Sequence, residues 1–162
     1  MNTNGAKLIM LLTLFTFVIG ACTKKSNTAT TDSKTAVRYK IGDYSRKYIG
    51  TKYKYAGKNP SGFDCSGFTS YVMSNFNVKL SSSSSAQAQQ GKKIPVEKVK
   101  KGDLIFFGKR GKVTHVAMVL KNTRDGITVI HSTSSKGVII QNVTKSTYWK
   151  PKILFARDVL SN

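Results

Sequence analysis

The sequence predicts a small α+β domain, in which helices in the first part pack on a mostly antiparallel sheet formed by the second part. Apolar residues at helical spacing occur up to about residue 91, whereas short apolar runs bounded by turns follow from residue 104. Helices that precede strands without alternating with them are typical of an α+β fold. The chain has 162 residues, 40% of them hydrophobic, which is enough for one domain with its own core.

The first helix is predicted from apolar residues at steps of three and four. Val37, Ile41, Tyr44 and Tyr48 would share one face of a helix that ends at Gly50. A loop is expected to follow at residues 53–63, because two glycines and an Asn-Pro pair occur there.

A second helix is predicted to begin at Cys65 and to end near Asn75. Asp64 is a good N-cap residue, and apolar residues at 68, 72 and 76 form one stripe that would face the core. A short third helix is predicted over residues 84–90, because a serine can cap its start and Gly91 can end it.

Five short strands are predicted in the second part of the chain. They cover residues 104–107, 113–120, 127–131, 138–141 and 153–157. An Asp-Gly pair at 125–126 predicts a hairpin turn between the second and the third of them.

The first 21 residues are typical of a secretory signal peptide. An apolar segment at 8–19 follows Lys7; it is too short to span a bilayer, and small residues separate it from Cys22. The Ile-Gly-Ala-Cys sequence at 19–22 resembles the bacterial lipobox, in which the cysteine is lipidated. The alternative is an ordinary signal peptide with a chance cysteine. We expect a lipoprotein signal peptide at 1–21, a membrane anchor at Cys22 and a flexible, lipid-anchored tether at 22–35, which lacks large apolar residues.

The chain is strongly basic, with 27 lysines and arginines, 7 acidic residues and a net charge of +20. Loss of Lys7 with the leader would leave 26 basic residues and a charge of +19. Such a charge favours an anionic surrounding, such as lipid phosphate, cell-wall polymer or an acidic peptide. The secretion signal and the absence of a nucleic-acid motif argue against a nucleic acid partner.

Cys65 is the candidate nucleophile, because Cys22 closes the leader. The unpaired N–H groups and the dipole of a helix N-terminus favour negative charge, so this position is expected to lower the pKa of the thiol. The alternative is a small, buried and inert thiol.

The only histidines of the chain, His115 and His131, lie on the two strands of the predicted hairpin. If the strands pair about the predicted turn, the imidazoles are directly opposite, with β-carbons about 5 Å apart. A cysteine nucleophile needs a base and a polar group that orients the base, and these two residues can supply both. The alternatives are zinc held by Cys65 and both histidines, although no metal-binding spacing is present, and two structural histidines on a sheet.

A series of motifs runs through the domain in a fixed order. The motifs are Gly-Thr-Lys-Tyr-Lys-Tyr-Ala-Gly at 50–57, Gly-Phe-Asp-Cys-Ser-Gly-Phe at 62–68, the serine-rich stretch at 80–91, Lys-Gly-Asp-Leu-Ile-Phe-Phe at 101–107, Thr-His-Val-Ala-Met-Val at 114–119 and Ile-His-Ser at 130–132. From about Ile49 to Val159 they resemble the NlpC-type cell-wall peptidases, a branch of the papain-like cysteine peptidases. The tail with Tyr148, Trp149 and Arg157 resembles that of the small murein-endopeptidase lipoproteins of Gram-negative envelopes.

The resemblance implies a papain-like fold with the nucleophile at a helix N-terminus, and it implies roles for single residues. Cys65 would be the nucleophile, His115 the base and His131 the group that orients the base. Tyr53 would bind the oxyanion together with the backbone N–H of Cys65.

The function implied is that of a cysteine endopeptidase that hydrolyses stem peptides or cross-links of peptidoglycan through an acyl-enzyme, without cofactor or metal. Asp64 and Ser66 would contact the substrate; helix capping is the alternative role of Asp64. Alternative functions are an amidase or transacylase with the same site, and a non-catalytic basic module that binds the envelope. We expect 36–162 to be the catalytic domain of a monomer in the cell envelope, anchored in the outer rather than the inner membrane if the host is Gram-negative.

Overall fold

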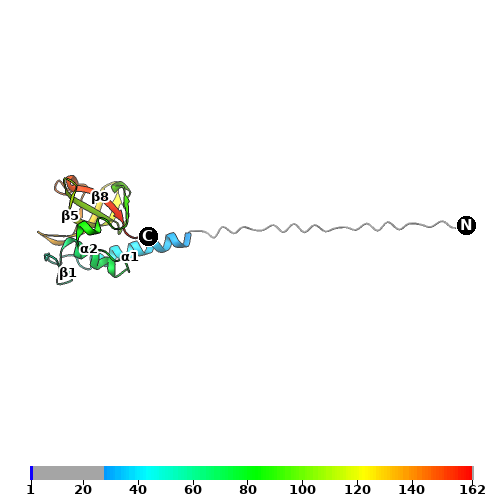
Figure 1. Cartoon of the computed structure of the whole chain (residues 1–162), viewed down its shortest axis with the longest axis horizontal. Coiled ribbons are helices and arrows are strands. Elements are labelled where there is room, and N and C mark those ends of the chain that lie inside the picture. Colours follow the sequence, from blue (N-terminus) through cyan, green and yellow to red (C-terminus); the bar gives the residue numbers. More distant parts are fainter. Residues whose placement is uncertain (2–27, 162) are drawn as a thin grey trace.

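The structure is a computed structural model that describes Met1 and residues 28–161 (Figure 1). The remainder of the predicted signal peptide, the lipidation site Cys22 and the first part of the predicted tether lie outside the described residues. Across the part that is described, none of the helices is both long enough and apolar enough to cross a bilayer.

The first helix, α1 (Thr28–Arg46), begins earlier than the sequence analysis predicted. Residues 28–35, which we assigned to the flexible tether, are helical, and this corrects the expected boundary. No glycine or proline interrupts these turns, so nothing local ends the helix there. Residues 32–36 are exposed, and this stretch of α1 therefore extends from the domain without contributing to the core.

The part of α1 that packs against the domain starts at Val37. Ile41 is fully buried in the core on the helical side of the sheet. Next to it, the guanidinium of Arg38 donates hydrogen bonds to the carboxylates of Asp103, over 2.6 Å, and Asp158, over 2.8 Å. One side chain of α1 thereby binds two carboxylates that lie much later in the chain. The buried guanidinium is stable because both carboxylates accept its hydrogen bonds and balance its charge.

The second helix, α2 (Cys65–Ser74), starts and ends as predicted. The Asp64 carboxylate accepts from the Gly67 N–H over 2.6 Å and caps the helix. Phe68 and Val72 are fully buried, so the apolar stripe faces the core. Helix α3 (Ser84–Gln87) is capped by Ser83 and is shorter than predicted, because the chain turns after Ala88.

Six strands form one antiparallel sheet in the order β3-β8-β4-β5-β6-β7, which confirms the predicted α+β class. Their bounds are β3 (Lys92–Ile94), β4 (Leu104–Lys109), β5 (Lys112–Thr123), β6 (Gly126–Thr133), β7 (Gly137–Asn142) and β8 (Ile153–Asp158). The sequence analysis missed β3, because a short polar edge strand has no pattern of its own and depends on its pairing with β8. A separate pair, β1 (Lys58–Asn59) and β2 (Gly62–Phe63), lies before α2.

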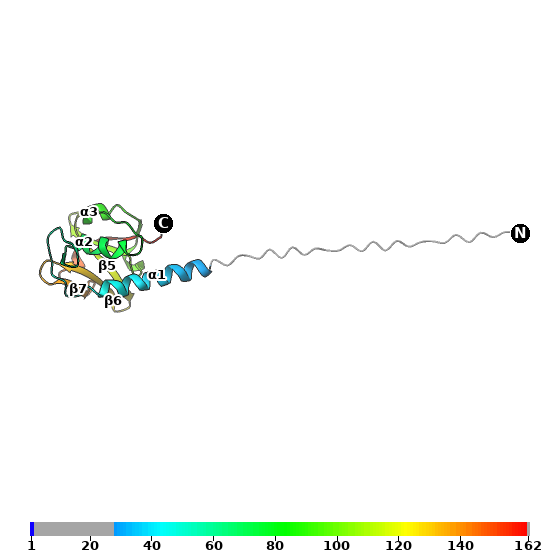
Figure 2. The same cartoon turned by 90° about the horizontal axis from the view of Figure 1, so that it is seen from below.

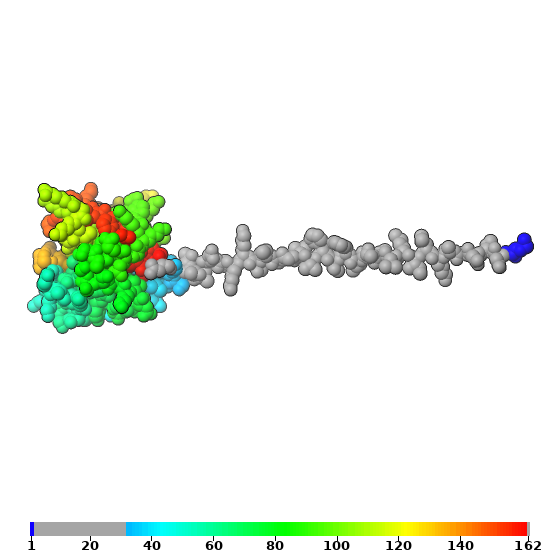
Figure 3. All heavy atoms as spheres, viewed as in Figure 1, coloured from blue at the N-terminus to red at the C-terminus, as the bar shows by residue number. Residues whose placement is uncertain are grey.

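The helices and the sheet form two layers (Figure 1), and the view from below shows α1, α2 and α3 on the same side of the sheet (Figure 2). One core lies between the helices and the sheet, with Phe68, Phe106 and Met118 among its members. A smaller core on the other face contains Phe107, with Trp149 packed against it. The turn between β4 and β5, with exposed residues 109–112, protrudes at one corner of the surface (Figure 3).

Candidate active site

The two histidines meet at the start of β5 and the end of β6. His115 Nε2 lies 3.0 Å from His131 Nδ1, so the rings share one hydrogen bond. The two residues are cross-strand neighbours, as predicted, but they are not directly opposite. Met118 pairs with Ile130, and a bulge follows Val119. If the pairing of Met118 with Ile130 is continued back along β5, His115 lies opposite Thr133. The imidazoles therefore meet diagonally across one face of the strand pair.

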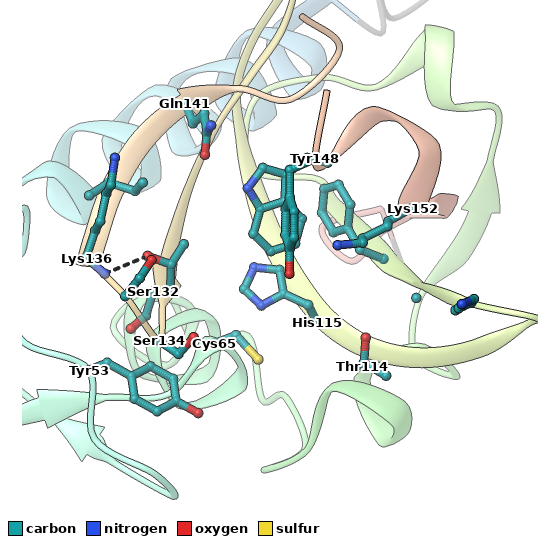
Figure 4. Close-up of a pocket in the computed structure, with 17 residues that line it drawn as sticks. Tyr53, Cys65, Thr114, His115, Ser132, Ser134, Lys136, Gln141, Tyr148 and Lys152 are labelled. Carbon is teal, nitrogen blue, oxygen red and sulfur yellow. Dashed lines mark hydrogen bonds between the residues drawn. The ribbon is translucent and has the colours of Figure 1, made fainter. Parts of the chain in front are cut away.

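Cys65 lies at the first turn of α2 and lines a cavity of about 630 Å³ together with His115 and Tyr53. Figure 4 shows its sulfur directed at one ring nitrogen of His115. Because Nε2 of that ring is bonded to His131, the nitrogen that faces the sulfur is Nδ1. The backbone N–H of Val116, the residue after His115, also donates to the sulfur.

Burial raises the pKa of the Cys65 thiol above its ordinary value, which corrects the expectation that the helix N-terminus would lower it. The backbone N–H groups of Val116, Ser66 and Cys65 act in the expected direction, but the loss of water around the sulfur is the larger effect. The carboxylate of Asp64 raises the pKa further.

The two imidazoles are held neutral. Burial, and next the proximity of His131, lower the pKa of His115 to about 3. Burial also lowers the pKa of His131 to about 4, and the nearby amide of Gln141 opposes this shift. At neutral pH the resting site is therefore a neutral thiol beside a neutral base, ready for transfer of one proton between them.

Aromatic rings enclose the histidines on the side away from α2. Trp149 packs against His115 with ring centroids 4.6 Å apart and against His131 at 5.0 Å. Phe107 contacts Trp149 at 5.1 Å. We call His115, His131, Trp149 and Phe107 the imidazole wall. The sequence analysis used Trp149 only as a mark of resemblance, and its packing depends on the loop before β8.

Tyr53 lines the same cavity as the thiol (Figure 4). Burial, and then negative charge at Cys65 and Asp64, raise the pKa of Tyr53. Its phenol therefore keeps its proton and can donate a hydrogen bond to a developing oxyanion.

Asp64 and Ser66 lie beside the nucleophile, but they are turned toward the protein. The Ser66 hydroxyl is bonded to Asp64 at 3.0 Å and to the carbonyl of Ser82 at 3.1 Å. Asp64 also caps α2, and neither residue is among those that line the cavity. Their contacts are those of residues that hold the N-terminus of α2 in place.

Three lysines lie around the cavity, and the sequence analysis did not single them out. Lys109, Lys136 and Lys152 line it, and we call them the lysine rim. Lys109 and Lys136 are exposed, whereas Lys152 is half-buried beside the ring of Tyr148. None of the described residues that line the cavity is acidic, so its mouth favours a negatively charged ligand.

Cys65, His115 and His131 were also considered as zinc ligands. Within residues 28–161, no group of three or more histidine, cysteine or acidic side chains is arranged to hold a metal ion.

Comparison with known proteins gives a consistent result. Residues 50–158 match the NlpC/P60 family. The chain is 33% identical to the gamma-DL-glutamyl hydrolase of Bacillus subtilis, over 100% of this chain and 39% of that protein. It is 31% identical to the murein DD-endopeptidase MepS/murein LD-carboxypeptidase of Escherichia coli K12, over 77% of this chain and 64% of that protein. The chain thus spans less than two thirds of the length of these relatives.

Solved structures agree with this match. The NlpC/P60 domain of the peptidoglycan hydrolase SagA is 36% identical, with a TM-score of 0.62 over 73% of this chain and 95% of that one. An NlpC/P60 family protein from Bacillus cereus is 31% identical, with a TM-score of 0.68 over 74% of this chain and 39% of that one. The predicted resemblance is confirmed, and the chain belongs to the NlpC/P60 family.

Proposed function

We propose that this protein is a cysteine endopeptidase that hydrolyses amide bonds in the peptides of peptidoglycan. One observation carries the proposal: the Cys65 sulfur faces His115, whose other ring nitrogen lies 3.0 Å from His131 (Figure 4). This is the order of nucleophile, base and orienting group that acyl transfer requires. The relatives named as hydrolases and endopeptidases support the same reaction class.

The first half-reaction is acylation. As the sulfur attacks the carbonyl carbon, its proton passes to Nδ1 of His115. The resulting oxyanion is bound by the backbone N–H of Cys65, at the start of α2, and by the Tyr53 hydroxyl. When the tetrahedral intermediate collapses, the C–N bond breaks, and His115 gives its proton to the leaving amine. A thioester on Cys65 and a free amine result.

The second half-reaction is hydrolysis of the thioester. His115, neutral again, accepts a proton from water as the water oxygen attacks the carbonyl carbon. The C–S bond then breaks, and the proton returns to the sulfur. Atoms balance over the cycle, because one water is consumed and one acid and one amine are formed. His131 and Trp149 hold the base in place, His131 by the 3.0 Å hydrogen bond to Nε2 of His115 and Trp149 by packing against its ring.

The charge around the cavity supports an acidic peptide as substrate. The lysine rim places three cationic groups at the mouth, and the stem peptides of peptidoglycan carry free carboxylates. The relative from B. subtilis is named a gamma-DL-glutamyl hydrolase, and a gamma-glutamyl bond leaves a free carboxylate near the scissile amide. We propose that the rim binds a substrate carboxylate, and that the identity of this group decides which bond is cut.

We further propose that the protein acts at the cell envelope as a monomer. A signal peptide at 1–21, lipidation of Cys22 and membrane attachment would place the catalytic domain, residues 36–162, near the wall. The net charge of +20 supports a location among anionic polymers. In a Gram-negative host we propose the outer membrane as the site of the anchor. Labelling with a radioactive fatty acid, compared between the wild type and Cys22→Ala, tests the anchor directly.

The function itself is tested by digestion of purified peptidoglycan, followed by mass spectrometry of the released muropeptides. New peptide termini with the wild type, and none with Cys65→Ala, are expected. New amide linkages instead of free termini would indicate a transacylase with the same site. Unchanged muropeptides, together with tight binding to the wall, would indicate a non-catalytic envelope-binding module.

A further inference from the structure

The histidine pair contains one polar atom that has no partner. His131 is fully buried, and its Nε2 has no hydrogen-bond partner among residues 28–161, although its Nδ1 is hydrogen-bonded to His115. A buried donor without an acceptor is costly because it has lost its water partners, so native proteins rarely leave one unsatisfied. An unpaired nitrogen beside the candidate base therefore calls for a physical account.

The protonation of this nitrogen decides whether His115 can act as a base. Both rings are neutral, so each carries one N–H. If His115 holds its proton on Nε2, it donates to His131, and its Nδ1 is free to accept the proton of Cys65. His131 must then hold its own proton on Nε2. In the opposite arrangement, His131 donates from Nδ1, the proton of His115 moves to Nδ1, and the base is blocked.

An acceptor at Nε2 of His131 would select the productive arrangement. The rings that face His131 are those of His115 and Trp149. His115 already uses Nε2 in the bond to His131, and the indole N–H of Trp149 is only a donor. Neither ring can therefore accept a hydrogen bond from the N–H at Nε2 of His131.

Gln141 is placed to supply the acceptor. In the β6–β7 register, His131 pairs with Ile139 and Val129 pairs with Gln141, so Gln141 lies diagonally from His131 on the same face of the sheet. Gln141 lines the same cavity as His115 (Figure 4). The amide is near enough to raise the pKa of His131.

We propose that Gln141 is a positioning residue whose Oε1 accepts the N–H of His131 Nε2 and thereby keeps Nδ1 of His115 free as the base. The chain of groups then runs from Gln141 through His131 and His115 to Cys65. This inference rests on the proposed function for its effect on rate, but the arrangement of protons that it requires exists in the free protein and can be measured there.

The direct test is nitrogen-resolved NMR of the two histidine side chains at pH 7 in the ¹⁵N-labelled domain. In the wild type we expect the Nε2–H form of both rings. Gln141→Met keeps the size of the side chain and removes the acceptor, so His131 is expected to populate the Nδ1–H form. With that variant, kcat is expected to fall about 10- to 100-fold while KM is unchanged, by analogy with the loss of a supporting hydrogen bond to a metal-ligating histidine.

Gln141→Glu is the conservative rescue, because a carboxylate also accepts. We expect it to retain the Nε2–H form and most of kcat. The titratable groups around His131 are His115, with Cys65 beyond it, and the lysines of the rim. The new negative charge would raise the pKa of both imidazoles, so the acid limb of the pH–rate profile would move to higher pH.

The matched control is Ile140→Met, which places the same side chain at the neighbouring position on the other face of β7. It is expected to change neither the tautomers nor kcat. An Nδ1–H form of His131 in the wild type would overturn the proposal, as would a Gln141→Met variant with wild-type tautomers and wild-type kcat. If no activity on peptidoglycan is found but the tautomers respond as described, the proposed function fails and the role of Gln141 stands.

Discussion

The imidazole wall and the lysine rim belong to one cavity, yet they differ in almost every physical respect. The wall is aromatic, with His131 and Phe107 fully buried and His115 and Trp149 half-buried. Burial there lowers the pKa of His115 to about 3 and that of His131 to about 4. The rim is formed by lysines of which two are exposed to solvent. Electrostatic effects are strong where water is excluded and are screened by salt where it is not.

This difference separates chemistry from recognition. The wall acts on one proton that moves over a short distance, so it requires fixed geometry and neutral resting groups. The rim acts on a charged ligand that arrives from solution, so its attraction reaches further and depends on ionic strength. Changes in the wall are therefore expected to alter kcat and the pH profile, whereas changes in the rim alter KM and the salt dependence.

The largest effect is expected for the sulfur of Cys65, which lies in the cavity that both regions line. Cys65→Ala removes the sulfur, and kcat/KM is expected to fall at least about 10⁴-fold, as for the loss of a nucleophile in other acyl-transfer enzymes. The measurement is release of muropeptides, and the circular dichroism spectrum is expected to stay native. Wild-type turnover in this variant would refute the assignment of Cys65.

The wall is tested by Trp149→Ala. Water that reaches the imidazoles would raise the pKa of His115 and His131 from about 3 and about 4 toward their ordinary value of 6.5. A base is active when neutral, so a higher pKa moves the acid limb of the pH–rate profile to higher pH. Looser positioning of the base would also lower kcat, on the order of 10- to 100-fold.

Tyr39→Ala is the control for this variant, because it removes a ring that is exposed on α1 and is not among the residues that line the cavity. It is expected to leave the acid limb unchanged. An acid limb that stays near the wild-type position in Trp149→Ala would show that the wall does not set the pKa of the base.

The rim is tested by the double variant Lys136→Gln and Lys152→Gln. Loss of two cationic groups at the mouth is expected to raise KM for an acidic substrate about 3- to 10-fold, with kcat nearly constant, and to weaken the dependence of KM on salt. The control is Lys98→Gln with Lys121→Gln, which removes the same charge from exposed positions outside the cavity lining. If both double variants behave alike, only the overall charge matters.

The smallest effect concerns stability. A histidine whose pKa is lower in the folded than in the unfolded protein binds its proton more readily after unfolding, so the free energy of unfolding falls as pH decreases from about 6.5 toward 3. Urea midpoints measured at pH 7 and pH 5 are expected to differ more for the wild type than for a variant with His115→Gln and His131→Gln. Equal differences would mean that the buried imidazoles are not held neutral.

Local features of the sequence determined much of the scaffold. Asp64 caps α2, and the apolar stripe behind it buries the helix, because both effects act within a few residues. The strands and the hairpin of β5 and β6 were predicted in the same way. That the two histidines come near each other also followed from the sequence, because a hairpin brings its two arms together, but the face and the offset depended on the register.

Only the tertiary structure decided the chemistry of the site. The bulge after Val119 made the histidines diagonal neighbours, and packing in three dimensions placed Trp149, Gln141 and the lysine rim around them. The same packing reversed the expected shift in the pKa of Cys65, because the water removed from a sulfur depends on every segment that covers it and not on its own helix alone. A sequence specifies contacts a few residues apart, whereas desolvation is a sum over neighbours that only the completed fold brings together.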